Sequence, residues 1–181
     1  KPFAVSFSGS GLVDETSFAA KIDLTTGASP AGLAIGDFDG DGKPDIAVAH
    51  NGSNNVSVLR NTGTSGSLAF DTKVDFATGL LSEGLAIGDL DGDGKQDLAV
   101  SNGNGNSVSV LLNTGSAGVL SFASKIDFPT GSFPFGVAIA DIDADGKPDL
   151  AVANRSSGTV SVLRNTSTVG SISFAAKADY T

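Results

Sequence analysis

Three short acidic segments carry the residues with the clearest chemistry. They read D-F-D-G-D-G-K-P-D from Asp37, D-L-D-G-D-G-K-Q-D from Asp89 and D-I-D-A-D-G-K-P-D from Asp141, at a constant spacing of 52 residues. Two like charges ~4 Å apart repel by about 1 kcal/mol even in water. A hard cation between the carboxylates would remove this repulsion, and Ca²⁺ accepts about 6–8 oxygen ligands in irregular geometry. The spacing therefore predicts three calcium sites.

The predicted ligands follow one pattern in all three segments, which we call the acidic loops. Aspartate side chains at the first, third, fifth and ninth positions, and the lysine carbonyl at the seventh, supply the oxygen atoms. These ligands are Asp37, Asp39, Asp41, Lys43 and Asp45; Asp89, Asp91, Asp93, Lys95 and Asp97; and Asp141, Asp143, Asp145, Lys147 and Asp149. Mg²⁺ is less favoured because it dehydrates reluctantly and uses fewer carboxylates. The alternative interpretation is three acidic surface turns without a metal.

The acidic loops are expected to lie between strands. An EF-hand begins in the same way but closes with Glu at position 12, where this chain has Val48, Val100 and Val152. The residues after each ninth aspartate begin I-A-V-A, L-A-V-S and L-A-V-A, and such apolar runs are typical of strands. Gly42 and its counterparts occupy the sharp turn, where a residue without Cβ accepts a positive φ.

Each acidic loop belongs to a unit of about 50 residues, a period typical of repeat architectures. One unit contains an alternating strand from Phe70, a short apolar strand from Gly84 that enters the loop, a strand from Asp97 that leaves it, and an alternating strand from Ser107. Four antiparallel strands joined by short turns predict the blade of a β-propeller. Since no segment shows a helical apolar period, we expect an all-β fold.

Three complete blades are predicted at about 31–82, 83–134 and 135–179. Residues 1–30 align with only the last two strands of a unit and are interpreted as a half-blade. About three and a half blades are fewer than the ~4–8 of closed propellers. We therefore expect an open arc whose unpaired edges and apolar faces favour association. A further propeller segment, or other copies of the chain, would complete it.

The repeats resemble FG-GAP/VCBS repeats, the type found in the integrin α-subunit propeller and in many bacterial surface proteins. The resemblance rests on the D-x-D-x-D-G-x-x-D loops, the A-I-G-D or A-I-A-D strand before each and the A-V-A or A-V-S strand after it. It covers nearly the whole chain, and it implies a metal in the hairpin between the first two strands of a blade. One departure is Ala144, where the other loops have Gly40 and Gly92. This position is not a ligand, so the third site is expected to survive.

The composition argues against several other functions. The net charge is −9, but twelve of the 20 acidic residues lie in the acidic loops, and the 11 basic residues are scattered. No nucleic-acid partner is therefore expected. The chain has no Cys for thiol chemistry, and no apolar run approaches the ~20 residues of a membrane span. The one histidine, His50, aligns with Asn102 and Asn154 and is interpreted as a turn residue. Because nothing signals a nucleophile, we do not expect an enzyme.

These observations favour a non-catalytic, calcium-stabilised β-propeller module that is extracellular or on a cell surface. Its expected role is adhesion, or binding of a protein or glycan ligand. Loop sites in extracellular modules bind calcium with Kd of only ~10⁻⁴–10⁻³ M, which suits the calcium concentration outside cells. One alternative is a structural protein whose open blades assemble head to tail into a filament. A further alternative is an enzyme, such as a polysaccharide lyase, on the same fold.

Overall fold

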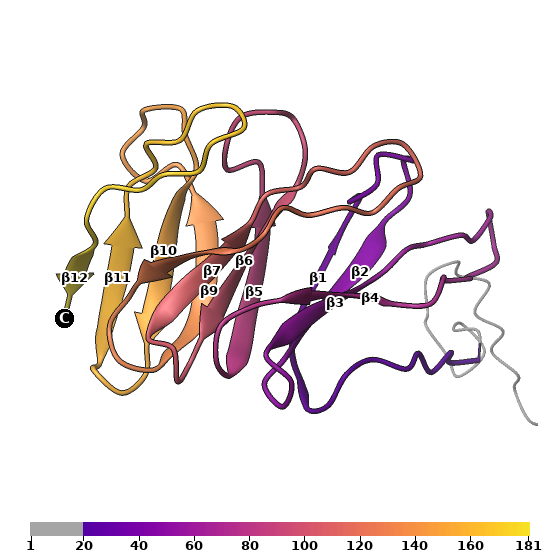
Figure 1. Ribbon diagram of the computed structural model, residues 1–181, viewed down its shortest axis with the longest axis horizontal. Coiled ribbons are helices and arrows are strands. Elements are labelled where there is room, and N and C mark those ends of the chain that lie inside the picture. Colours follow the sequence, from indigo (N-terminus) through magenta and orange to yellow (C-terminus); the bar gives the residue numbers. More distant parts are fainter. Residues whose placement is uncertain (1–19) are drawn as a thin grey trace, which may run out of the picture.

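The computed structural model describes residues 20–181, which form three four-stranded antiparallel sheets in sequence order (Figure 1). The first sheet contains β1 (Pro30–Gly36), β2 (Asp45–His50), β3 (Asn55–Leu59) and β4 (Val74–Ala77). The second contains β5 (Ser82–Gly88), β6 (Asp97–Asn102), β7 (Ser107–Leu111) and β8 (Ile126–Pro129). The third contains β9 (Pro134–Ala140), β10 (Asp149–Asn154), β11 (Thr159–Leu163) and β12 (Ala178–Tyr180). We call these sheets blades 1, 2 and 3.

The blades share one register, which confirms the repeat read from the sequence. In blade 1, Leu33 lies opposite Val48, and in blade 2 Leu85 lies opposite Val100. Strand order within each blade follows the chain, as in the predicted four-stranded blade. The predicted all-β class is also confirmed, because residues 20–181 contain no helix. Accordingly, no helix able to cross a membrane is found in this part of the chain.

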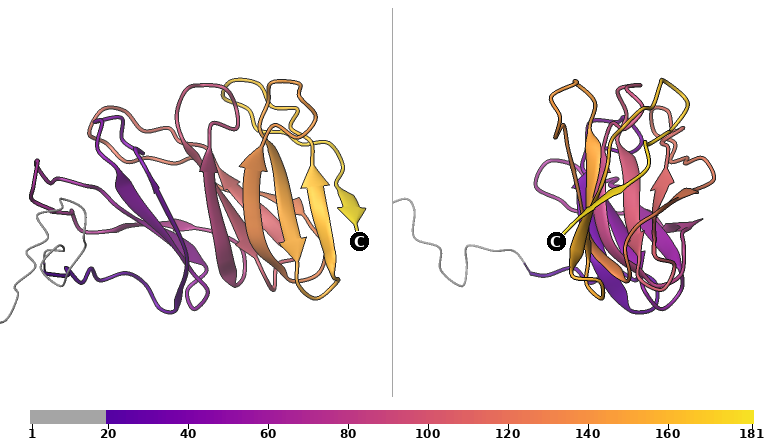
Figure 2. Two further views of the ribbon diagram at one scale, coloured as in Figure 1. Left: turned by 180° about the vertical axis from the view of Figure 1, so that it is seen from behind. Right: turned by 90° about the vertical axis from the view of Figure 1, so that its left-hand side faces the viewer.

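The three blades stand in a row and do not close into a ring (Figure 2). The predicted half-blade falls mostly on residues 1–19, outside the described part of the chain. Within the described residues, the alternating segment 21–24 forms no strand. The strand predicted to pair with this segment lies in residues 5–13, so the predicted pairing falls outside the described residues.

The hydrophobic core lies between blades, because each sheet has two apolar faces and cannot bury either one alone. One cluster joins blades 1 and 2, and a second joins blades 2 and 3. In the first, the rings of Phe76 and Phe122 meet edge to face with centroids 4.9 Å apart. In the second, Phe128 and Phe174 repeat this contact at the same distance. Stacking of blades is therefore what buries the core.

The first strands of the blades, β1, β5 and β9, approach one another closely along the inner side of the row. A Cβ atom on Gly32 would lie 2.5 Å from the carbonyl oxygen of Glu83, and one on Gly84 would lie 2.3 Å from that of Phe135. Only glycine fits at such distances. The small residues before each acidic loop thus allow the first strands to pack at the crowded inner side of the row.

The fourth strand is shorter than the alternation from Phe70 predicts, because β4 begins only at Val74. The preceding residues leave the blade and form a hairpin that is held by isolated bridges between Asn61 and Phe70 and between Thr64 and Ser67. We call this feature the outer hairpin. It spans residues 60–71 in blade 1 and recurs at 112–123 and 164–175. The alternation continues through the hairpin because its side chains also pack between blades.

Candidate metal centre

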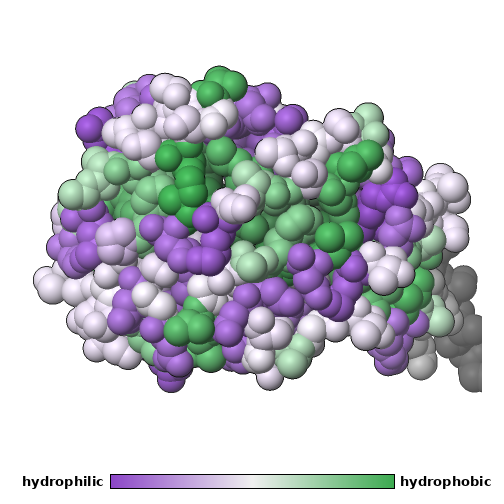
Figure 3. Space-filling view, viewed as in Figure 1, coloured by the Kyte–Doolittle hydropathy of each residue, from purple (hydrophilic) through white to green (hydrophobic). Residues whose placement is uncertain are grey.

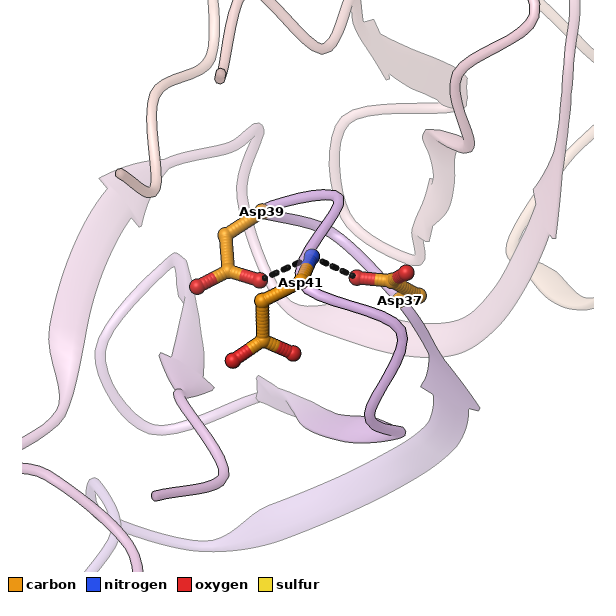
Figure 4. Close-up of side chains that lie close together, drawn as sticks. All are labelled: Asp37, Asp39 and Asp41. Carbon is orange, nitrogen blue, oxygen red and sulfur yellow. Dashed lines mark hydrogen bonds between the residues drawn. The ribbon is translucent and has the colours of Figure 1, made fainter. Parts of the chain in front are cut away.

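The three acidic loops connect the first and second strands of their blades and lie along the same edge of the row, at the top of Figure 1. In the first loop the backbone wraps around one carboxylate. Asp37 accepts hydrogen bonds from the backbone N–H groups of Gly40 (2.8 Å) and Gly42 (2.9 Å). The N–H of Asp41 lies between two carboxylates, 3.1 Å from Asp39 Oδ1 and 3.2 Å from Asp37 Oδ1 (Figure 4). The loop thus turns three carboxylates toward one point.

The glycine at the turn of each acidic loop has the backbone conformation that the sequence predicts. Gly42, Gly94 and Gly146 have φ angles of 85°, 87° and 87°. Two positions earlier the third loop differs from the others, since Ala144 has a φ of 62°. An L-residue with a side chain pays an energetic penalty in this left-handed region. The third loop therefore keeps the shape of the other two at a cost in stability.

The ninth aspartates, Asp45, Asp97 and Asp149, are buried, and each holds two backbone groups together. In the second loop Asp97 accepts the N–H of Leu90 at 2.8 Å and that of Asn113, at the start of the outer hairpin, also at 2.8 Å. The same pair of bonds occurs in the other two blades. The ninth aspartate therefore ties the acidic loop to the outer hairpin of its own blade.

Burial also changes the proton affinity of these carboxylates. It raises the pKa of Asp97 to about 6, against the opposing effect of the hydrogen bonds from Asn113 and Leu90. Burial likewise raises the pKa of Asp45 above its ordinary value. A nearby divalent cation favours the charged form of a carboxylate and opposes such a shift. The buried carboxylates thus suit a site that holds a cation.

Each acidic loop brings three carboxylates within 4.8 Å of one another. These groups are Asp37, Asp39 and Asp41; Asp89, Asp91 and Asp97; and Asp141, Asp143 and Asp149. Three of the four predicted aspartates therefore converge in each loop, while Asp45, Asp93 and Asp145 lie outside the groups. The carbonyls of Lys43, Lys95 and Lys147 remain predicted ligands. The all-oxygen donor set fits a hard cation such as Ca²⁺.

One carboxylate oxygen gives a further indication that a cation belongs in the first loop. Asp39 Oδ2 is buried and has no hydrogen-bond partner. The nearest positive group is Nη1 of Arg60, 3.6 Å away. Buried polar atoms are normally paired, and a bound metal would satisfy this oxygen. The three loops are therefore compatible with metal binding, and the chemistry they could supply is structural cross-linking of the blade.

The sequence reasoning missed a set of contacts between blades that lies beside the loops. The Asn113 side-chain amide of blade 2 donates to the carbonyl oxygen of Phe38 in blade 1 at 2.9 Å. In the same way, Asn165 of blade 3 donates to the carbonyl oxygen of Leu90 in blade 2 at 2.8 Å. The signal was present, because an N-T dipeptide follows the third strand in every unit, but its role is visible only once the blades are stacked.

These contacts cover the first two acidic loops and leave the third uncovered. The outer hairpins of blades 2 and 3 lie over the loops of the preceding blades (Figure 1). As a result Phe38 and Leu90 are each 1% exposed, whereas Ile142, at the same position in the third loop, is 51% exposed. The first two loops are thus partly covered by the blade that follows them.

His50 belongs to a buried polar network rather than to a surface turn. Its Nε2 accepts the N–H of Gly27 at 3.2 Å and lies 2.9 Å from Ser57 Oγ, which donates to Asp75 at 2.5 Å. Burial lowers the pKa of His50, against the attraction of Asp75. The serine lies between the histidine and the aspartate, so the histidine is not placed between nucleophile and carboxylate as in a catalytic triad.

The same network recurs with asparagine in place of histidine. In blade 2, Asn102 Oδ1 accepts the N–H of Gly79 at 3.0 Å, and its Nδ2 donates to Ser109 Oγ at 2.8 Å. The amide has one acceptor and one donor group for these two roles, whereas in blade 1 both contacts fall on a single imidazole nitrogen. The other nitrogen, Nδ1, is buried with no partner. His50 is therefore an imperfect substitute for asparagine.

Comparison with known proteins identifies the repeat. The family model described as FG-GAP-like repeat matches three overlapping stretches of the chain, residues 7–48, 37–100 and 89–152. Each match begins or ends near an acidic loop, and together they span most of the sequence. The search of curated proteins found no match.

Proposed function

Because the chain belongs to the FG-GAP-like repeat family, we propose that it is a non-catalytic, calcium-stabilised β-propeller module. We place it outside the cell or on the cell surface, where it serves adhesion or binds a protein or glycan ligand. The observation that carries the calcium part of the proposal is the convergence of three carboxylates within 4.8 Å in every acidic loop.

Bound calcium would act on stability in two places. Within a blade it neutralises the clustered carboxylates and fixes the turn between the first two strands. Between blades it shapes the surface on which the next outer hairpin rests, since Gly118 N donates to Asp39 O at 3.0 Å and Gly170 N to Asp91 Oδ2 at 2.6 Å. The ion thus supports both the blade and the stacking of blades.

The non-catalytic part of the proposal is supported by His50, the one histidine of the chain. It is fully buried, and its partners recur in blades 2 and 3 around an asparagine that has no proton-transfer role. The extracellular part is supported by the loop chemistry, since short acidic loops in extracellular modules bind calcium at ~10⁻⁴–10⁻³ M.

The calcium proposal is tested by titration calorimetry and thermal unfolding of the whole chain. We expect three equivalents of Ca²⁺ to bind and Mg²⁺ to bind more weakly. At about 10 mM Ca²⁺ and a Kd of ~10⁻⁴ M, each site stabilises the fold by about 2.7 kcal/mol. EDTA should therefore lower Tm strongly, and added Ca²⁺ should restore it. A melting curve that EDTA leaves unchanged would contradict the proposal.

The binding role needs a separate measurement. Glycan arrays and cell-surface extracts probed with labelled protein, in calcium and in EDTA, should show retention that depends on calcium. Incubation with acidic polysaccharides tests the lyase alternative, because lyases leave unsaturated products that absorb in the ultraviolet. Appearance of such products would overturn the non-catalytic assignment.

A further inference from the structure

We propose that a second copy of this chain docks its blade 1 onto the exposed face of blade 3, in the same way that successive blades dock within one chain. The interaction surface on blade 3 comprises Ile142, Asp143, Ala153, Val160 and Tyr180, which we call the leading face. The surface on blade 1 comprises Leu33, Ile35 and Leu68, which we call the trailing face.

The leading face of blade 3 is exposed where the same face of the other blades is buried. Val160 is 40% exposed, whereas Val56 and Val108, at the same position in blades 1 and 2, are fully buried. Ile142 and Tyr180 are 51% and 61% exposed. Exposed apolar patches of this kind mark association surfaces. A separate band of apolar side chains runs along the face of the molecule shown in Figure 3.

Within residues 20–181, the trailing face of blade 1 is exposed in a complementary way. Leu33, Ile35 and Leu68 are 61%, 58% and 66% exposed. Their counterparts in blades 2 and 3 pack into the two core clusters, where Ile172, the counterpart of Leu68, is only 8% exposed. The side chains that blade 1 exposes are therefore those that fill the leading face of a preceding blade.

Polar groups at the two faces are complementary as well. Asn113 and Asn165 each donate both to a carbonyl of their own blade and to a carbonyl of the preceding blade. Within the described residues, the amide of Asn61 donates only to its own blade, at Pro44 O. The acceptor that continues the pattern is the carbonyl of Ile142, at the leading face. A second copy would bring this donor and acceptor together.

Blade 3 lacks one hydrogen-bond acceptor that blades 1 and 2 present to the following blade, and this difference offers a sensitive test. Asn54 accepts the N–H of Leu81 in blade 2 at 2.8 Å, and Asn106 accepts that of Phe133 in blade 3 at 2.9 Å. Blade 3 has Gly158 at this position, beside a hollow of about 550 Å³. Its φ of 64° suits asparagine, and a Cβ there would meet nothing within 4 Å. Gly158→Asn should restore the missing acceptor.

The interface is heterologous, since it joins two different surfaces, so it can propagate from copy to copy. Sedimentation velocity of the wild-type chain in saturating calcium should show mass that increases with concentration. Charges placed in an apolar contact weaken association by at least about tenfold, so Ile142→Glu and Leu33→Glu should each be monomeric. Both side chains are exposed, and circular dichroism checks that both variants fold. Val160→Lys provides a second block of the leading face.

Mixing the variants tests the direction of the contact. Ile142→Glu retains its trailing face and Leu33→Glu retains its leading face, so a one-to-one mixture should form a dimer that cannot grow further. Gly158→Asn should self-associate about threefold or more tightly than the wild-type chain, which is the effect of one added hydrogen bond. A wild-type chain that stays monomeric at all concentrations would overturn the proposal and leave the leading face to another partner. Association that survives Ile142→Glu and Val160→Lys would overturn it too.

Discussion

The side-chain amide of Asn113 and the carbonyl oxygen of Phe38, 2.9 Å apart, are joined by a hydrogen bond that crosses from one blade to the next. The bond is buried, and it lies at the start of an acidic loop. Asn165 and Leu90 repeat it at the following boundary. This contact connects the acidic loop of one blade to the packing of the next, and it has measurable consequences.

The first prediction concerns this hydrogen bond. Asn113→Ala should lower the free energy of unfolding by about 1–3 kcal/mol, because it leaves buried carbonyl groups unsatisfied. Asn61→Ala is the matched control, since Asn61 makes the corresponding in-blade bonds and, among the described residues, none to another blade. Denaturant unfolding at low protein concentration should give a smaller loss for the control. Equal losses would contradict an inter-blade role for Asn113.

A second prediction separates the effect of bound metal on stability from the effect of the Asp39 side chain itself. Asp39→Asn should lower the number of bound Ca²⁺ ions in a calorimetric titration from three to two. In EDTA the same variant should unfold at a higher temperature than wild type, because it removes one of three carboxylates that lie within 4.8 Å of one another and repel without a cation. In saturating Ca²⁺ the order should reverse. Destabilisation of the variant under both conditions would show that Asp39 has a purely structural role.

The third prediction concerns Ala144. Ala144→Gly should stabilise the chain by about 1 kcal/mol, since glycine accepts the left-handed φ of 62° without a steric penalty. The reciprocal change Gly40→Ala should destabilise the first loop by a similar amount. A Cβ on Gly40 meets no atom within 4 Å, so this change tests the backbone conformation alone. Thermal unfolding in calcium measures both effects.

A fourth prediction concerns pH. Above about pH 6.5, His50 is neutral in both the folded and the unfolded chain. Below this pH the unfolded chain takes up a proton that the folded chain resists, because burial lowers the pKa of His50 in the fold. Its contribution to stability therefore falls as the pH falls. His50→Asn should remove this part of the pH dependence, and should add about 1 kcal/mol by restoring the hydrogen bonds of the repeat.

The measurement for His50 is the difference in unfolding free energy between His50→Asn and wild type, followed from about pH 8 to about pH 5.5. Carboxylates common to both proteins, including Asp97 with its pKa of about 6, cancel in this difference. The advantage of the asparagine variant should grow as the pH decreases. A constant difference over the whole range would mean that His50 keeps its ordinary pKa in the folded chain.

The repeat made the fold predictable from the sequence. A 52-residue period, alternating strands and the turn at Gly42 were enough to identify four-stranded blades in an open row. These features are local, because a positive φ or a two-residue alternation depends on the residue itself and its neighbours. The convergence of three aspartates in each acidic loop was predictable for the same reason. A single nine-residue segment supplies all of them.

The contacts that depend on stacking were not predictable. The sequence predicts a turn residue at His50, but its ring is buried against Ser57 because the turn from Gly27 closes over it. The inter-blade role of Asn113 was missed for a similar reason, since its partner Phe38 lies 75 residues away. Sequence periodicity locates such residues within a unit but does not show which atom of the neighbouring unit each one meets.

The unequal exposure of the three acidic loops has a consequence for how quickly each would exchange its ion. Asp39 and Asp91 are buried in the first two loops, whereas Asp143, at the same position in the third loop, is exposed. Release of an ion requires water to replace the carboxylates. Asp41 and Asp93 are open to water in the first two loops, but the carboxylate at the third position is exposed only in the third loop. When calcium falls, we therefore expect the third loop to lose its ion earliest and the first two loops to follow on a slower timescale. In an isolated chain, a fall in calcium would therefore empty the loop of blade 3 first and the loops of blades 1 and 2 afterwards.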